Sequence, residues 1–182
     1  MKYCSTRNRK LDFNFKQIFQ RSLAPDGGLF LPKKIKKFSS KDLKKLEKLN
    51  YTDLAVAVIG SFCEPTFNKK QLKILIRKSY KKFKKKNVVN LVSINKDILL
   101  ELYHGPTLAF KDIAMQLLGN FYEYYLNKEN EKINIVVATS GDTGAAAIDA
   151  IKGKKNVNIF VLHPNNRISS VQRRLMTTVG EN

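Results

Sequence analysis

The apolar residues in the first half of the chain recur at the spacing of amphipathic helices. The segments 13–23, 41–49, 53–63 and 68–83 each place apolar residues three or four positions apart. The last segment has lysines on its polar side and gathers five residues on one face: Leu72, Leu75, Ile76, Ser79 and Phe83. The pattern predicts a mainly helical N-terminal region, interrupted at 24–32 by a turn and a short extended piece.

The second half of the chain alternates between two kinds of segment. Runs rich in β-branched and apolar residues predict strands at 88–94, 97–103, 133–139 and 157–163. The last two runs are expected to be buried parallel strands, because apolar residues dominate both. Helical spacing predicts helices over three segments: 111–126, 144–153 and 169–179.

Alternating strands and helices with short connections indicate an α/β fold with right-handed crossovers. We predict two domains. Residues 1–87 form a mainly helical N-terminal domain. Residues 88–182 form an incomplete open, mostly parallel sheet with flanking helices.

Lysine gives the chain an unusual charge. The formal net charge is +19, from 34 Lys and Arg against 15 Asp and Glu. Such an excess is typical of proteins that bind nucleic acid or acidic membranes. Lysine greatly exceeds arginine, however, and Asn, Ile, Phe and Tyr are also plentiful, all with A- and T-rich codons. We therefore favour a compositional origin over a nucleic-acid partner, which salt-dependent binding to random duplex would reveal.

The sequence shows no sign of export or membrane insertion. The basic N-terminus lacks the apolar core of a signal peptide. The longest apolar run, 54–60, is far shorter than the ~20 residues that cross a bilayer. Cys4 and Cys63 form no C-x-x-C pair, which favours a reducing compartment over a disulfide scaffold or metal site. We predict a cytoplasmic protein without a membrane partner or a bound metal.

A loop with the sequence TSGDTG follows the predicted strand at 133–139. Ligands bind at this end of the strands in parallel sheets. The chain turns sharply at Ser140 and Gly141, and Thr143 opens a helix whose free N–H groups attract a carboxylate or phosphate. The loop is neither a P-loop nor a dinucleotide fingerprint. Asp142 is unusual beside an anion, and it either caps the helix or orients a ligand hydroxyl or cation.

A second loop, HGPT at 104–107, leads into an apolar stretch that contains Lys111. Thr107 is the candidate cap of the following helix. The positive end of a helix and apolar burial both disfavour an ammonium group. Both effects favour the neutral amine, which is the nucleophile that forms a Schiff base with an aldehyde. The alternative is a surface lysine whose ammonium group reaches solvent.

The two loops together resemble the threonine synthase family, pyridoxal-phosphate enzymes of the tryptophan-synthase-β fold type. The segments ELYHGPTLAFKD (101–112) and ATSGDTGAAAIDA (138–150) carry the resemblance. Two more segments are similar to the same family in the same order, DGGLFLP (26–32) and LHPNNRISSVQRRLMTT (162–178). The resemblance therefore extends over essentially the whole chain.

The resemblance implies a cofactor, a substrate and a reaction. Lys111 would carry pyridoxal 5′-phosphate as an internal aldimine, and its amine would shuttle protons while the cofactor delocalises the carbanion. The substrate would be O-phospho-L-homoserine. Phosphate would leave from the γ carbon and water would add at the β carbon, giving L-threonine and phosphate.

The resemblance also implies roles for the loop residues. Ser140, Gly141 and Thr143 would grip the substrate carboxylate or phosphate. Asp142 would lie near the phenolic oxygen of the cofactor, where relatives often have Asn.

Three further residues receive implied roles. His104 and Thr107 would line the approach to Lys111, and a turn histidine with satisfied hydrogen bonds is the alternative for His104. Arg167 would help to hold the substrate phosphate, with a solvated arginine as the alternative. Asn166 replaces a family glycine and is expected to preserve its turn, because Asn tolerates the left-handed conformation.

Two parts of the family pattern are missing from this sequence. They are the glycine-rich loop that cradles the cofactor phosphate and the hydroxyl residue that contacts the pyridine nitrogen. Threonine synthases are more than twice this length, so we expect an N-terminal portion, from a truncated gene, from a split gene with a separate C-terminal half, or from a longer chain represented in part. Its exposed apolar edges predict poor solubility, weak cofactor retention and no activity alone.

Two other interpretations involve catalysis or its loss. The segment DTGA at 142–145 matches an aspartic-protease motif, but Ser-Gly precedes it and a helix-forming alanine run follows, so we set it aside. A non-catalytic relic, or a related phospholyase acting on another phosphorylated amino acid, stays open because the discriminating residues are absent.

Overall fold

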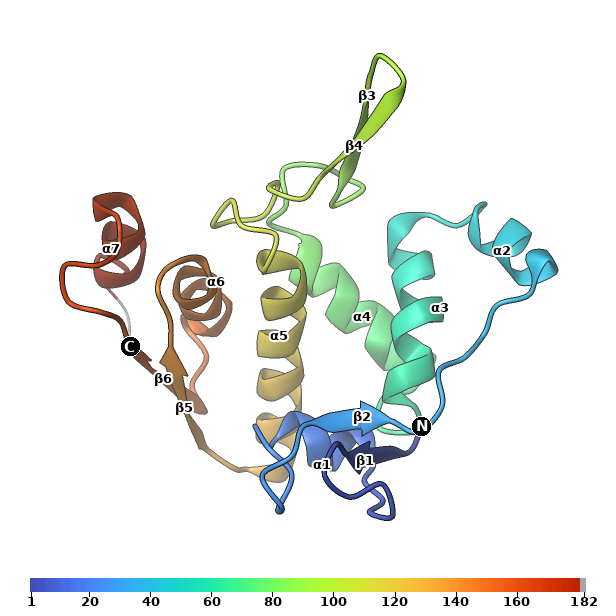
Figure 1. The fold of residues 1–182 in the computed structure, drawn as a ribbon, viewed down its shortest axis with the longest axis horizontal. Coiled ribbons are helices and arrows are strands. Elements are labelled where there is room, and N and C mark those ends of the chain that lie inside the picture. The colour runs from blue at the N-terminus through green and yellow to red at the C-terminus, as the bar shows by residue number, and fades with distance from the viewer. Residues whose placement is uncertain (181–182) are drawn as a thin grey trace. The chain divides into compact units, whose positions relative to one another are not determined.

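The protein was analysed as a computed structural model, which describes residues 1–180. The chain forms two compact units, Met1–Ile76 and Arg77–Asn182, that divide inside one helix. The predicted domain boundary near residue 87 stays a prediction. The helices and strands, labelled in Figure 1, are β1 (Tyr3–Ser5), α1 (Phe15–Phe19), β2 (Phe30–Pro32), α2 (Ser40–Leu46), α3 (Tyr51–Cys63), α4 (Lys69–Tyr80), β3 (Asn90–Ile94), β4 (Asp97–Glu101), α5 (Asp112–Glu129), β5 (Ile133–Ala138), α6 (Asp142–Ile151), β6 (Val157–Leu162) and α7 (Ser170–Thr177).

The first unit is mainly helical, as the apolar spacing predicted. β1 and β2 form a short antiparallel pair in which Tyr3 faces Pro32. The rings of Phe15, Phe19 and Phe67 pack together, with centroids 5.5 to 6.4 Å apart. Ile76, on the predicted apolar face of α4, has no solvent exposure. Burial of such side chains, at about 25 cal/mol per Å² of apolar surface, is the main stabilisation of the unit.

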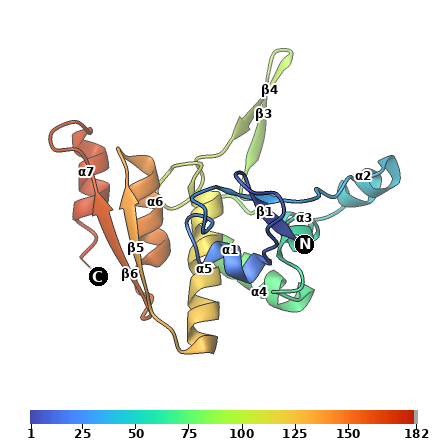
Figure 2. The same cartoon turned by 60° about the horizontal axis from the view of Figure 1, so that its bottom comes forward.

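The second unit is built on the parallel strand pair β5–β6, which Figure 2 shows with α6 beside it. The register runs from Ile133 opposite Val157 to Ala138 opposite Leu162, so the strands end at the same edge. A core of Leu126, Ile151 and Val157 joins α5, α6 and β6. The predicted parallel strands and the α/β class are confirmed.

The prediction that these strands are buried is only half right. Side chains alternate between a half-buried face and an exposed face along both β5 and β6. On the exposed face, Val136 and Phe160 are 65% and 55% accessible, and Asn158 donates a hydrogen bond to Asn134 at 2.9 Å. No described element covers this face, because α5 and α6 pack on the other side.

β3 and β4 form an antiparallel hairpin apart from the parallel pair. Both strands were predicted, but their membership of one mostly parallel sheet was not correct for the described residues. The tight turn at Asn95, which takes a left-handed conformation with φ 54°, favours pairing with the next segment of the chain. Several of its apolar side chains are exposed: Leu91, Ile94, Ile98, Leu99 and Leu100.

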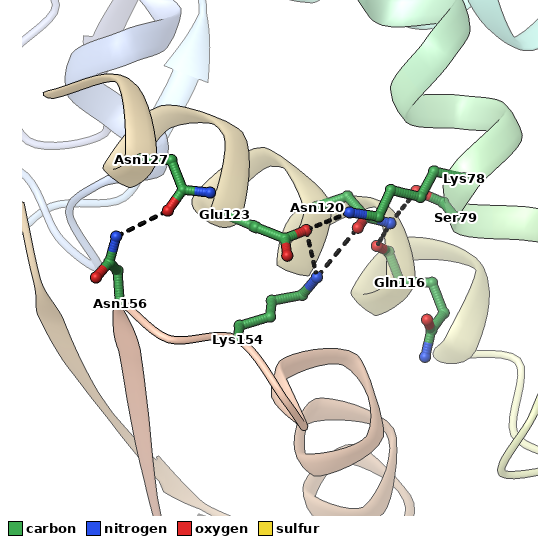
Figure 3. A network of polar contacts seen from close by, with 8 residues as sticks. All are labelled: Lys78, Ser79, Gln116, Asn120, Glu123, Asn127, Lys154 and Asn156. Atoms are coloured by element: carbon green, nitrogen blue, oxygen red, sulfur yellow. Dashed lines mark hydrogen bonds and ion pairs between the residues drawn. The ribbon is translucent and has the colours of Figure 1, made fainter. Parts of the chain in front are cut away.

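A network of polar contacts ties α5 to the end of α4 and to the turn before β6 (Figure 3). The Glu123 carboxylate accepts from Lys78 Nζ at 2.6 Å and from Lys154 Nζ at 3.0 Å. Lys154 also donates to Asn120 Oδ1 at 3.1 Å, and Asn120 donates to Ser79 Oγ at 2.8 Å. Burial lowers the pKa of Lys154. Part of the lysine excess therefore has a structural role in the fold.

Two further observations bear on the environment of the protein. No helix among residues 1–180 is long and apolar enough to cross a membrane. Cys4 and Cys63 are free thiols and both are buried, and burial raises the pKa of Cys63 to about 12. A thiol with so high a pKa is a poor nucleophile at neutral pH.

Candidate active site

The loop 139–144 lies at the carboxyl edge of the parallel pair, where it was predicted. Thr139 continues the pairing, because its N–H donates to the carbonyl of Leu162 at 2.9 Å. The turn after β6, at 163–169, begins at the same edge because Ala138 and Leu162 are register partners. The two loops that carry family motifs in the C-terminal half therefore start side by side.

The start of α6 presents unpaired backbone donors. Its N-cap is Gly141, which has no side chain to cap the helix. Among the described residues, none accepts a hydrogen bond from the N–H groups of Asp142 and Thr143. The Asp142 carboxylate does not cap the helix, so that alternative is wrong; Oδ1 accepts from Gln172 Nε2 at 3.1 Å. The loop is left with donors at the positive end of the helix dipole.

Two glycines let other side chains approach this loop closely. A Cβ atom on Gly144 would lie 2.5 Å from Met176 Sδ and 2.6 Å from Thr139 Cγ2. A Cβ atom on Gly141 would lie 2.3 Å from Gln172 Nε2. Atoms do not approach so closely without displacement, so both positions exclude larger residues while the surroundings keep this packing.

The HGPT loop is held by a buried acid. Asp112 has no solvent exposure, and its carboxylate accepts from the Thr107 N–H at 2.8 Å and from Thr107 Oγ1 at 2.7 Å. The prediction that Thr107 caps the helix is wrong, because the threonine donates and the helix-start acid accepts. Burial raises the pKa of Asp112, although the hydrogen bonds from Thr107 oppose the shift.

The backbone between Thr107 and the helix is unusual. A Cβ atom on Gly105 would lie 2.4 Å from the Asp112 side chain, so a glycine lets the acid pack against the loop. Leu108 takes a left-handed conformation with φ 62° and is exposed. This conformation costs a non-glycine residue about 1–2 kcal/mol. Strain of this kind concentrates at functional sites.

Lys111 occupies the N-cap position of α5, so the helix begins at Asp112, one residue later than predicted. Its side chain is half-buried, so the predicted apolar burial is only partial. The Nζ atom lies 4.3 Å from the centroid of the exposed Phe110 ring. Lys111 and Thr143 line one hollow of about 440 Å³, together with Phe110, Ile113, Ala114 and Met115. The structure therefore brings the lysine motif and the TSGDTG motif to one place.

His104 is buried and has a hydrogen-bonding partner. Its Nε2 atom lies 2.9 Å from Glu101 Oε2, and its ring packs on Tyr103. Hydrogen bonds from Asn90, Tyr103 and His104 lower the pKa of Glu101 to about 2. The geometry matches the alternative of a turn histidine with satisfied hydrogen bonds, and a substrate contact for His104 stays a prediction.

The turn after β6 forms as expected. Asn166 has φ 54°, so asparagine adopts the left-handed conformation predicted for it. Arg167 is exposed, and Ser169 caps α7 by accepting from the Gln172 N–H at 3.2 Å. The exposed guanidinium is free to reach a ligand at this edge, and its phosphate contact stays a prediction.

Two residues of this region were missed by sequence reasoning. Asp112 was visible only as an acid in the first turn of a helix, with no sign that it is buried. Gln172 carried no signal, because its contact with Asp142 joins positions thirty residues apart.

Comparison with known proteins agrees with this geometry. Residues 2–80 match the family profile described as threonine synthase N terminus. Threonine synthase of Pseudomonas aeruginosa is 41% identical over 184 residues, which cover 100% of this chain and 39% of the relative. This chain is similar to the N-terminal part of threonine synthases. The family resemblance predicted from the motifs is confirmed.

Other threonine synthases match equally well. That of Saccharomyces cerevisiae is 40% identical over 195 residues, covering 98% of this chain and 38% of the relative. The crystal structure of PLP-bound threonine synthase from Brucella melitensis matches 100% of this chain and 39% of its own, with 42% identity and a TM-score of 0.91. The chain thus spans about two fifths of the length of these threonine synthases.

Proposed function

We propose that this chain provides the lysine-bearing part of a threonine synthase, a pyridoxal-phosphate-dependent lyase. The reaction converts O-phospho-L-homoserine and water to L-threonine and phosphate. The observation that carries the proposal is the hollow shared by Lys111 and Thr143, beside the unpaired N–H groups that open α6.

The described residues fit pyridoxal 5′-phosphate at this hollow. Lys111 Nζ is the amine that would hold the cofactor aldehyde, and its half-buried position leaves it accessible. When bound, the cofactor supplies an electron sink for the substrate carbanion. Asp142 is assigned to the region of the phenolic oxygen, where its partner Gln172 holds the carboxylate.

The remaining assignments concern the substrate. Thr143 and the N–H groups at the start of α6 bind the carboxylate or phosphate, with Ser140 and Gly141 shaping the turn. Thr107 and His104 keep the HGPT loop in place beside Lys111 through Asp112 and Glu101. Arg167 adds a positive charge for the substrate phosphate. Lys111 would also move the substrate protons, because the amine that holds the cofactor would lie beside the reacting carbon.

The compartment and partner follow from the same proposal. We place the protein in the cytoplasm. The cofactor site would be completed by the remaining part of a threonine synthase, either on the same chain or on a separate C-terminal half. Isolated chain is then expected to retain the cofactor weakly.

Covalent trapping tests the proposal. The purified chain is incubated with pyridoxal 5′-phosphate, reduced with borohydride and digested, and the pyridoxyl group is located by peptide mass spectrometry. We expect Lys111 to be labelled at lower cofactor concentration than the exposed lysines. Labelling spread evenly over the lysines would contradict the proposal.

A matched pair of variants sharpens this test. Lys111→Arg keeps the positive charge and removes the reactive amine, so preferential labelling should vanish. Lys152→Arg changes an exposed lysine whose Nζ donates to the carbonyl of Val179, and it should leave the labelling of Lys111 unchanged. If titration of the isolated chain with pyridoxal 5′-phosphate gives a visible absorption band that saturates tightly at one cofactor per chain, the expectation of weak cofactor retention is wrong.

A further inference from the structure

Gln172 connects α7 to the TSGDTG loop through both ends of its amide. Its Nε2 atom donates to Asp142 Oδ1 at 3.1 Å, and Ser169 Oγ donates to its Oε1 atom at 3.2 Å. Ser169 is the N-cap of α7, so the amide is oriented by the helix on which it stands. An amide with an oriented oxygen presents its nitrogen as a fixed donor.

The loop is shaped to receive this amide. A Cβ atom on Gly141 would lie 2.3 Å from Gln172 Nε2 and 2.6 Å from its amide carbon. Gly141 is buried, although it belongs to a surface loop. The amide therefore covers the glycine, and the contact does not depend on the hydrogen bond alone.

The contact explains why an acid is tolerated beside an anion site. A carboxylate at the start of a helix is attracted to the free N–H groups and the positive dipole end. Asp142 would then act as an internal anion that competes with an external one. Its carboxylate instead accepts from Gln172, while the N–H groups of Asp142 and Thr143 keep no acceptor among the described residues.

We infer that Gln172 is a positioning residue that holds the Asp142 carboxylate away from the start of α6 and so keeps the loop open for an anion. The inference rests on the proposed function, since it assigns an anion to this loop. It adds a residue outside both motifs, and its action runs through Asp142 alone.

The first experiment follows the backbone amides by NMR through an acid titration of the full chain. An amide proton that donates to a carboxylate shifts when that carboxylate is protonated. In the wild type we expect protonation of the Asp142 carboxylate to move the Thr143 amide proton only slightly. In Gln172→Met we expect the same amide proton to shift clearly more, because it then donates to that carboxylate. Val171→Met, at the exposed neighbouring position, should behave as the wild type.

The second experiment measures affinity for inorganic phosphate from the same amide signals. Release of the competing carboxylate in Gln172→Met should weaken phosphate binding about fivefold, the effect of one hydrogen bond of ordinary strength. In an Asp142→Asn background the same substitution should change the affinity less than twofold, because no carboxylate is left to hold.

The outcomes separate the role of Gln172 from the proposed function. Equal weakening of phosphate binding in both backgrounds, or a Thr143 amide proton that shifts equally in the wild type and in Gln172→Met, would overturn the role of Gln172. Signals of β5 and β6 report whether Gln172→Met folds, and Gln172→Leu replaces it if it does not. The labelling of Lys111 is a separate readout, so failure of the proposed function is recognised independently of the Gln172 result.

Discussion

Thr107 donates both its backbone N–H and its hydroxyl to the buried carboxylate of Asp112, at 2.8 and 2.7 Å. The contact joins the HGPT loop to the first residue of α5, directly after Lys111. The position of Lys111 thus depends on a hydrogen-bonded pair whose members lie on either side of it in the sequence.

Thr107→Val should destabilise the chain by about 1–3 kcal/mol, because a buried carboxylate loses one of its donors. Thr177→Val is the matched control, since that exposed hydroxyl donates only to a carbonyl of its own helix; its effect should stay within about 0.5 kcal/mol. Urea unfolding followed by circular dichroism measures both. If the two substitutions lower the free energy of unfolding equally, the contact between Thr107 and Asp112 adds no more stability than an exposed hydrogen bond.

Glu101 should give the hairpin a pH-dependent stability. Its folded pKa of about 2 lies below the ordinary value of 4.5 because of hydrogen bonds from Asn90, Tyr103 and His104. The unfolded chain binds more protons in this window, so the contribution is present above pH 4.5 and is lost as the pH falls towards 2. Comparing the wild type with Glu101→Gln by thermal melts between pH 2 and 6 isolates it. A difference independent of pH would contradict the assignment.

Gly119→Ala should destabilise the packing of α5 on α6. A Cβ atom there would lie 2.4 Å from the carbonyl oxygen of Ala150, and overpacking of this kind costs about 1–3 kcal/mol. Gly60→Ala, inside α3, is the control, because its Cβ would meet only Leu72 Cδ2 at 3.6 Å. Alanine is the better helix former by about 1 kcal/mol, so this control should stabilise the chain. The denaturant midpoints of both variants measure these changes, and a Gly119→Ala midpoint at or above that of the wild type would contradict the prediction.

Lys154→Met should destabilise the second unit by about 1–3 kcal/mol, since Asn120 Oδ1 and the Glu123 carboxylate each lose a donor. The difference from the wild type should also depend on pH. Burial places the folded pKa of Lys154 below 10.5, so the unfolded chain binds more protons just below that value and wild-type stability rises with pH there. Lys152→Met, which changes an exposed lysine, should neither destabilise the second unit nor change how its stability depends on pH.

The exposed face of β5–β6 should govern self-association. Val136 and Phe160 are register partners and both are exposed, so Val136→Lys breaks the apolar patch without touching the core. We expect less aggregation by light scattering and an unchanged melting temperature. Ile135→Lys places the same charge on the face that packs against the core and should unfold the unit. If Val136→Lys leaves aggregation unchanged, the surface that drives self-association lies elsewhere, for example on the β3–β4 hairpin.

Much of this protein was determined by the sequence alone, because some information is local. The spacing of apolar residues predicted the helices and strands, since each element must bury one side whatever its neighbours are. Asn166 was predicted to take a left-handed turn, and it does, because that preference belongs to the residue itself. The two motifs, read together, predicted the family.

Only the tertiary structure decided which residues meet. Helical spacing does not tell that Asp112 is buried and accepts from Thr107, or that the Gln172 amide reaches Asp142. It does not tell that β5 and β6 are covered on one face only. The physical reason is that a residue pattern reports a side chain's preference for water, whereas a contact between distant positions depends on how whole elements pack.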